Sequence, residues 1–165
     1  MTLDDIPSGA GVFIDANPIV YYFASDPVLG PSSARLIARI QNHDISAYTS
    51  THVLCEAGHK LMLVEASTQF GWKSKVTQHL RQQPALVQQL TNFRRAIQQV
   101  RQLGIQVLDI TSSLVEQGCL VSQQTGLLTN DALLLAVMQA NGLTCVASND
   151  PDFDRVPGFT RYSPA

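Results

Sequence analysis

The sequence lacks the features that mark membrane, secreted and zinc-binding proteins. Its apolar runs, such as Ala132 to Met138, are far shorter than the roughly 18 residues that a membrane span needs. Residues 1–7 hold two aspartates and no basic residue before an apolar stretch, so we expect no secretory signal. These absences predict a cytoplasmic protein that has no membrane partner.

Cysteine is scarce, and its spacing excludes a thiolate metal site. Cys55, Cys119 and Cys145 are an odd number at wide spacings, and each has apolar neighbours in the sequence. We expect three buried, reduced thiols that pack as small hydrophobic groups.

Phosphate loops and histidine metal motifs are also missing. No glycine-rich loop of the P-loop or dinucleotide type occurs, which argues against a nucleotide cofactor. His52, Glu56 and His59 are close in sequence, but no H-E-x-x-H motif is formed, so zinc is disfavoured. A histidine that tunes Glu56 and an ordinary surface histidine both stay open as readings of His52 and His59.

Charged residues make up 15% of the chain and hydrophobic residues 45%, which excludes disorder and suits one domain over residues 1–165. The charge is unevenly placed. Residues 66–104 carry six basic residues and no acidic one, a local charge of +6, while the remainder carries −8. This stretch is either the solvated faces of two helices or a surface that attracts RNA. The candidate RNA contacts are Lys73, Lys75, Arg81, Arg94 and Arg95.

Strand-like and helix-like segments alternate along the chain. The buried run Val12–Ile14 predicts the first strand, and Asn17-Pro18 predicts a cap and start for the helix after it. Further strands are expected at residues 44–48, 105–110, 144–148 and 159–162. Helices are expected from Gly30, over 52–64, as a pair divided near Pro84, over 113–124, and over 131–140 with Thr129-Asn130 as its cap. Strands separated by helices predict an α/β fold whose parallel sheet is covered on both faces, with ligands beyond the carboxyl ends of the strands.

Three acids are expected near the carboxyl ends of the strands. Asp15 ends the first strand, Asp150 follows the strand at 144–148, and Asp131 lies in the first turn of its helix, where the dipole favours a carboxylate. Each has a simpler explanation: a helix cap for Asp15, a turn before Pro151 for Asp150, and complementation of the dipole for Asp131.

Glu56 lies beside the apolar stripe of its helix, which Val53, Ala57, Leu61 and Val64 form. It could be a surface residue, or it could reach over the same edge. If Glu56 joins the other three acids there, carboxylates that converge repel one another unless protons or cations lie between them. An all-oxygen cluster suits Mg²⁺ or Mn²⁺ rather than zinc.

Four stretches carrying these acids together resemble a PIN domain. They are Phe13–Asn17, Ser50–Glu56, Thr129–Ala136 and Ala147–Gly158, and the last, with its Ser-Asn-Asp, Asp-Phe and Val-Pro-Gly, is the most specific. The resemblance extends from about Val12 to Tyr162.

The resemblance implies a three-layer α/β/α fold with about five parallel strands in the order 3-2-1-4-5. Glu56 and Asp131 are 75 positions apart, which is longer than in compact members and implies a helical insertion at about residues 66–104. It also implies a Mg²⁺- or Mn²⁺-dependent endonuclease that acts on single-stranded RNA. The implied catalytic and metal-binding residues are Asp15, Glu56, Asp131 and Asp150, supported by Asn17, Ser148 and Asp152.

Small members of this family are often the toxin of a VapBC-type toxin–antitoxin pair, which would make a VapB-like antitoxin and a second copy of the chain the expected partners. The alternative is a catalytically silent PIN fold that binds RNA or a protein. A calcium loop after Asp150 is excluded, because an EF-hand needs glycine and glutamate where Arg155 and Arg161 stand. Phe70, Trp72 and Phe93 either stack on bases, or pack the inserted helices together, or form a dimer contact.

Overall fold

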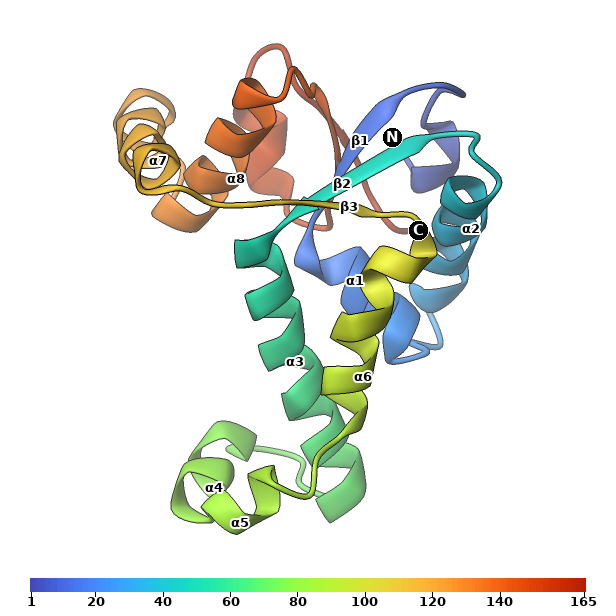
Figure 1. The fold of residues 1–165 in the computed structure, drawn as a ribbon, viewed down its shortest axis with the longest axis vertical. Helices are drawn as coiled ribbons and strands as arrows, with labels where there is room; N and C mark the ends of the chain where they lie inside the picture. Colours follow the sequence, from blue (N-terminus) through green and yellow to red (C-terminus); the bar gives the residue numbers. More distant parts are fainter.

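The computed structural model describes residues 1–165, and a parallel five-stranded sheet of order β3-β2-β1-β4-β5 lies at its centre (Figure 1). Strand β1 (Gly11–Ile14) is the middle strand, and Val12, Phe13 and Ile14 are fully buried, as a strand covered on both faces requires. The other strands are β2 (Ser46–Ser50), β3 (Gln106–Leu108), β4 (Cys145–Ala147) and β5 (Thr160–Tyr162). The predicted fold class and strand order are confirmed.

The first strand and first helix are joined differently from the prediction. Helix α1 (Ala16–Phe23) is capped by Asp15, whose side chain accepts from the Ala16 N–H, so the prediction that Asn17 is the cap was wrong. An aspartate in extended conformation at the end of a strand can accept a hydrogen bond from the first amides of the helix that follows. The helix therefore begins directly after Asp15, before the proline. Strand β2 also starts two residues after the predicted position, because Asp44 is bound to Arg39 at 2.6 Å outside the sheet.

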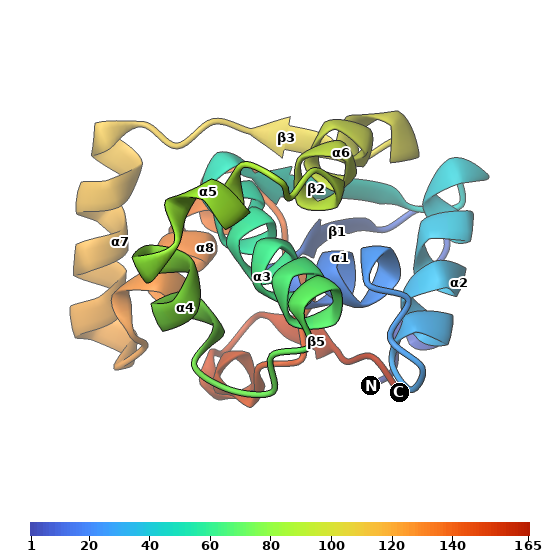
Figure 2. The ribbon, with the colours of Figure 1, turned by 90° about the horizontal axis from the view of Figure 1, so that it is seen from below.

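Helices α2 (Gly30–Gln41), α7 (Ser112–Thr125) and α8 (Thr129–Ala140) flank the sheet with α1 and α3, and α7 and α2 lie at opposite ends of the molecule in Figure 2. Every residue of α8 from Ala132 to Met138 is buried, so this helix is surrounded by protein. Gly118 lets α7 approach it closely, since a Cβ there would lie 3.0 Å from the Leu133 Cα. Helix α8 starts at Thr129 with Leu128 as its cap residue and no side-chain cap, so the predicted Thr129-Asn130 cap was wrong.

Helix α3 (Thr51–Phe70) runs six residues beyond the predicted end and leads away from the sheet (Figure 1). It is followed by α4 (Val76–Gln82), α5 (Pro84–Val87) and α6 (Asn92–Gln99), so the stretch that we predicted to hold a pair of helices divided near Pro84 holds three. We call residues 62–93 the arm. Short 3-10 helices complete the chain: η1 (Leu3–Asp5), η2 (Val100–Leu103) and η3 (Pro151–Arg155).

The arm has a small hydrophobic core of its own. Ala66, Leu80 and Leu90 are buried, and Phe70, Trp72 and Phe93 pack against them. The rings of Phe70 and Trp72 are 4.8 Å apart. Packing between the helices of the arm is therefore the role of these aromatic residues in the fold.

The prediction that the three thiols are buried was wrong, because none of them is fully buried. All three are free, but Cys55 and Cys119 are exposed and Cys145 is half-buried. Residues two positions apart on a helix lie about 200° apart around its axis, so Cys55 faces outward while Val53 and Ala57 are buried. No helix of the structure combines the length and the apolar character that a membrane crossing requires.

Candidate metal-binding site

Asp15 is the buried member of the predicted acid group, with 6% of its surface exposed. One carboxylate oxygen accepts from the Ala16 N–H at 2.6 Å, and the other accepts from the Ser148 hydroxyl at 2.8 Å and, weakly, from the Asn17 amide at 3.4 Å. Burial raises the pKa of Asp15, the bonds from Ser148 and Ala16 oppose this, and the charge of Glu56 raises it further. The net shift is upward, so a charged Asp15 gains from a nearby cation.

Ser148 ties the ends of two neighbouring strands together. Its hydroxyl donates to Asp15 beyond β1 and accepts the Asp150 N–H at 3.0 Å beyond β4. Asp150 then caps η3 by accepting the Asp152 N–H at 2.9 Å. The serine therefore brings Asp15 and Asp150 to the same edge of the sheet.

Asp131 lies where the charges of the other acids meet. Burial raises the pKa of Asp131 to about 6, helped by the negative charges of Asp150, Asp15, Asp152 and Glu56. These charges arrive from β1, β4, α3 and η3, so segments that are distant in sequence lie near one another here. A cation between them would relieve this repulsion.

Glu56 is half-buried on α3 and reaches the same region. Its carboxylate is 2.7 Å from the Lys60 ammonium, which also donates to the Asn17 Oδ1 at 2.9 Å. The charge of Glu56 acts on both Asp15 and Asp131. Neither His52 nor His59 forms a hydrogen bond to it, and the buried Nε2 of His52 has no hydrogen-bond partner.

The carboxylates of this site are the type of ligand that a hard divalent ion prefers, but they are too far from one another for three of them to share one ion in this structure. No group of three or more His, Cys, Asp or Glu side chains is close enough in this arrangement to hold one ion. The side chains gathered around Asp131 are carboxylates, which Mg²⁺ and Mn²⁺ prefer. Binding would therefore require the side chains to close on the ion.

Two basic residues near the acids were missed by the sequence analysis. Lys60 follows Glu56 by one helical turn, a spacing that could have predicted the pair. Arg161 pairs with Asp154 at 2.7 Å and donates to the Ser148 carbonyl at 3.2 Å, and thereby fixes the loop that carries Ser148 and Asp150. No local pattern indicates this second contact. Asp152 is paired outward with Arg155 at 2.8 Å.

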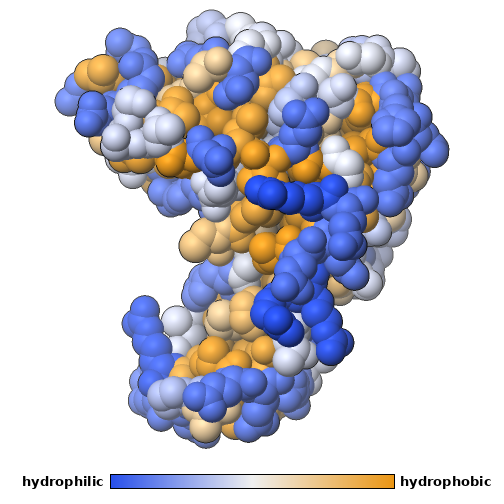
Figure 3. All heavy atoms as spheres, in the orientation of Figure 1, coloured by the Kyte–Doolittle hydropathy of each residue, from blue (hydrophilic) through white to orange (hydrophobic).

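The predicted RNA contacts do not join the acid group. They are exposed, form no ion pair, and lie on the arm or on α6: Lys73, Lys75, Arg81, Arg94 and Arg95. From Glu56 to Phe70, near Lys73 and Lys75 in sequence, α3 rises about 21 Å at about 1.5 Å per residue. Arg94 lies nearer, in a hollow that Cys55 and Gly58 of α3 also line. Figure 3 shows the surface hollowed between the arm and the end of the molecule formed by α7 and α8.

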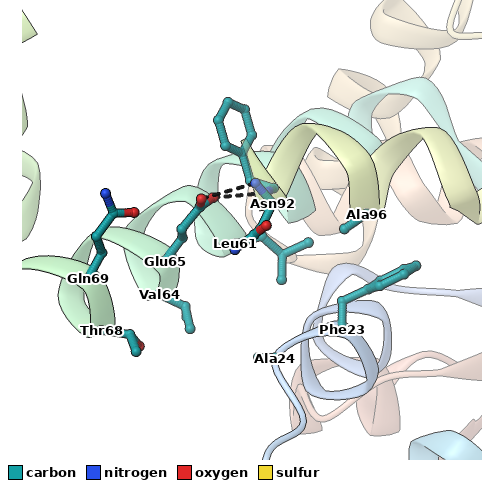
Figure 4. A pocket seen from close by; sticks show the side chains of 10 residues that line it. Phe23, Ala24, Leu61, Val64, Glu65, Thr68, Gln69, Asn92 and Ala96 are labelled. Atoms are coloured by element: carbon teal, nitrogen blue, oxygen red, sulfur yellow. Dashed lines mark hydrogen bonds between the residues drawn. The ribbon is translucent and has the colours of Figure 1, made fainter. Parts of the chain in front are cut away.

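Glu65 is a further carboxylate that lies in a hollow, and its role is structural. The hollow has a volume of about 230 Å³, lies between α1, α3 and α6, and is lined by Glu65, Phe23 and Leu61 among others (Figure 4). Glu65 accepts from the backbone N–H groups of Thr91, Asn92 and Phe93 at 2.9 to 3.0 Å, and so caps α6. Burial raises the pKa of Glu65, but these three bonds lower it by more, and the net shift is downward.

Comparisons with known proteins agree with the fold. The family model described as PIN domain matches residues 12–158. The VapC20 toxin of Mycobacterium tuberculosis, which cleaves the sarcin-ricin loop, is similar in structure, with a TM-score of 0.60 and 20% identity over 90% of this chain and 96% of that one. VapBC2 of Rickettsia felis, solved with promoter DNA, has a TM-score of 0.54 and 18% identity over 93% of this chain and 98% of that one. A toxin–antitoxin complex from Klebsiella pneumoniae has a TM-score of 0.54 and 17% identity over 90% of this chain and 95% of that one. No curated protein sequence matches the chain.

Proposed function

The chain belongs to the PIN domain family, and from that premise we propose that it is a Mg²⁺- or Mn²⁺-dependent endoribonuclease that hydrolyses phosphodiester bonds in single-stranded RNA. The observation that carries the proposal is the environment of Asp131, whose pKa is raised by burial and by four other acids. Charges that repel one another at one edge of a parallel sheet are the arrangement that a bound divalent ion would stabilise.

In this proposal Asp15, Asp131 and Asp150 would hold the metal, and Glu56 would orient the attacking water. The ion would lower the pKa of that water and neutralise phosphate charge. Ser148 keeps Asp15 oriented through its 2.8 Å bond, and the Asn17 amide adds a weak contact to the same carboxylate at 3.4 Å. Glu56 or solvent would accept the proton that the attacking water gives up.

The cations of the arm and of α6 would contact the RNA backbone at points outside the acid group, while the cleaved bond lies at the acids. They are exposed and unpaired, so they are free to contact phosphates. A strand that reaches both the acids and Lys73 or Lys75 must extend about 20 Å along α3, whereas Arg94 lines a hollow with Cys55 and Gly58, beside Glu56 in sequence. Short oligonucleotides that fill only the acid site would gain little from Lys73 and Lys75.

The decisive experiment compares RNA cleavage by the wild type and Asp15→Asn in Mn²⁺, in Mg²⁺ and in chelator. Cleavage should require the metal and fall by at least about a hundredfold in the variant, whose fold is checked by circular dichroism. Glu116→Gln is the matched control, because Glu116 is an exposed acid on α7. Undiminished cleavage by Asp15→Asn would reject the site. RNA binding without metal-dependent cleavage would favour the silent binding module.

We place this nuclease as the toxin of a VapBC-type pair, with a VapB-like antitoxin and a homodimeric toxin. Similarity to VapC20 and to two toxin–antitoxin complexes over nearly the whole chain supports this role. Expression of the protein alone should arrest growth and degrade RNA, and co-expression of the product of a short neighbouring reading frame should relieve both. Normal growth with intact RNA would reject the toxin role, and light scattering of the purified protein tests the dimer.

A further inference from the structure

Lys60 is more than one half of a surface ion pair. Its ammonium lies 2.7 Å from Glu56 on its own helix and 2.9 Å from the Asn17 oxygen on α1, a residue 43 positions earlier. An exposed pair four residues apart on a helix needs no partner from another element. The Lys60 ammonium instead contacts two side chains beside the acid site, Glu56 on α3 and Asn17 on α1.

The ammonium also lies close enough to Asp15 to act on it. Asn17, which accepts from Lys60, directs its own amide toward the Asp15 carboxylate at 3.4 Å. The positive charge of Lys60 lowers the pKa of Asp15, against the larger effect of burial. The two arginines nearby have other partners, because Arg155 pairs with Asp152 and Arg161 pairs with Asp154.

We propose that Lys60 is the built-in counter-ion of the metal-free site: its ammonium holds Glu56 and Asn17 in place and is displaced when a divalent ion binds. A divalent ion and an ammonium repel each other and compete for the Glu56 carboxylate. Lys60 is thus a positioning residue that weakens metal binding while it stabilises the metal-free fold. The inference rests on the metal site proposed above.

The test is calorimetric titration of the full-length protein with Mn²⁺ alone. Lys60→Gln should bind Mn²⁺ more tightly by roughly tenfold, the size expected when one charge is removed near a divalent ion in a partly solvated site. Lys60→Arg keeps the charge and should bind as the wild type does. Arg35→Gln is the matched control, because it removes one positive charge from an exposed pair with Asp4 at 2.7 Å, away from the site.

Thermal unfolding gives an independent readout. In chelator Lys60→Gln should unfold at a lower temperature than the wild type, and added Mn²⁺ should raise its unfolding temperature by more. Equal or weaker Mn²⁺ binding by Lys60→Gln, with a wild type that binds, overturns the role of Lys60 alone. A wild type and a Lys60→Gln variant that both fail to bind Mn²⁺ overturn the metal site, and this inference with it.

Discussion

Replacing Asp131 by asparagine should stabilise the metal-free protein. The folded pKa of Asp131 is about 6 and the ordinary value is 3.8, so the folded state disfavours the charged form. A difference of about 2.2 between the two corresponds to about 3 kcal/mol at full strength. The side chain is partly exposed and solvent screens its neighbours, so we expect roughly 1 kcal/mol of added stability at pH 7.5.

The pH dependence fixes the sign of this effect. An unfolded chain releases the Asp131 proton near pH 3.8, while the folded chain keeps it until about pH 6. The wild type therefore loses stability as the pH rises through that window, because the native state holds more protons there. Asp131→Asn has no proton to lose. Its advantage should be absent at pH 4 and complete above pH 7.

Urea unfolding in chelator at both pH values measures this difference, with Glu116→Gln as the control for removal of an exposed acid. Excess Mn²⁺ should reverse the order, since only the wild type would gain binding energy from the metal. The reasoning would be refuted by an Asp131→Asn variant that is no more stable than the wild type at pH 7.5 in chelator.

Three other changes test the scaffold and the arm. Gly118→Ala should lower the free energy of unfolding by about 1 kcal/mol, because a Cβ 3.0 Å from the backbone of α8 costs more than the gain in helix propensity, as urea unfolding would show. Glu65→Gln should cost about 1 kcal/mol and speed amide hydrogen exchange at residues 91–93, and unchanged exchange would contradict its capping role. Joint replacement of Arg94 and Arg95 by glutamine should reduce the salt slope of binding to long single-stranded RNA by about 1.4, measured in chelator, and an unchanged slope would remove α6 from the RNA path.

The sheet could be predicted from the sequence because its signals are local. Val12–Ile14 is a continuous apolar run that is followed by Asp15. Such a run is typical of a strand that is buried on both faces of a parallel sheet. The strand order came from a family resemblance and not from the pattern of residues. The course of α3 was predicted only in part, since its apolar residues Met62 and Ala66 pack in the small core of the arm and not against the sheet.

The candidate site divides in the same way. Placing Asp15 and Asp150 at one edge needs only the ends of β1 and β4, which the sequence indicates. The contacts of Lys60 with Asn17 and of Arg161 with Ser148 depend on how separate elements pack, and no spacing along the chain encodes them. The roles of the four acids as ligands stay predictions.

Anomalous scattering from a crystal soaked in Mn²⁺ would show whether Asp15 and Asp131 bind the same metal ion. We predict a Mn²⁺ peak at roughly 2 Å from carboxylate oxygens of Asp15 and Asp131, with Asp150 and Glu56 turned toward it and Lys60 moved away. A map with no peak beside Asp15, or with Mn²⁺ bound only elsewhere on the chain, would contradict the account.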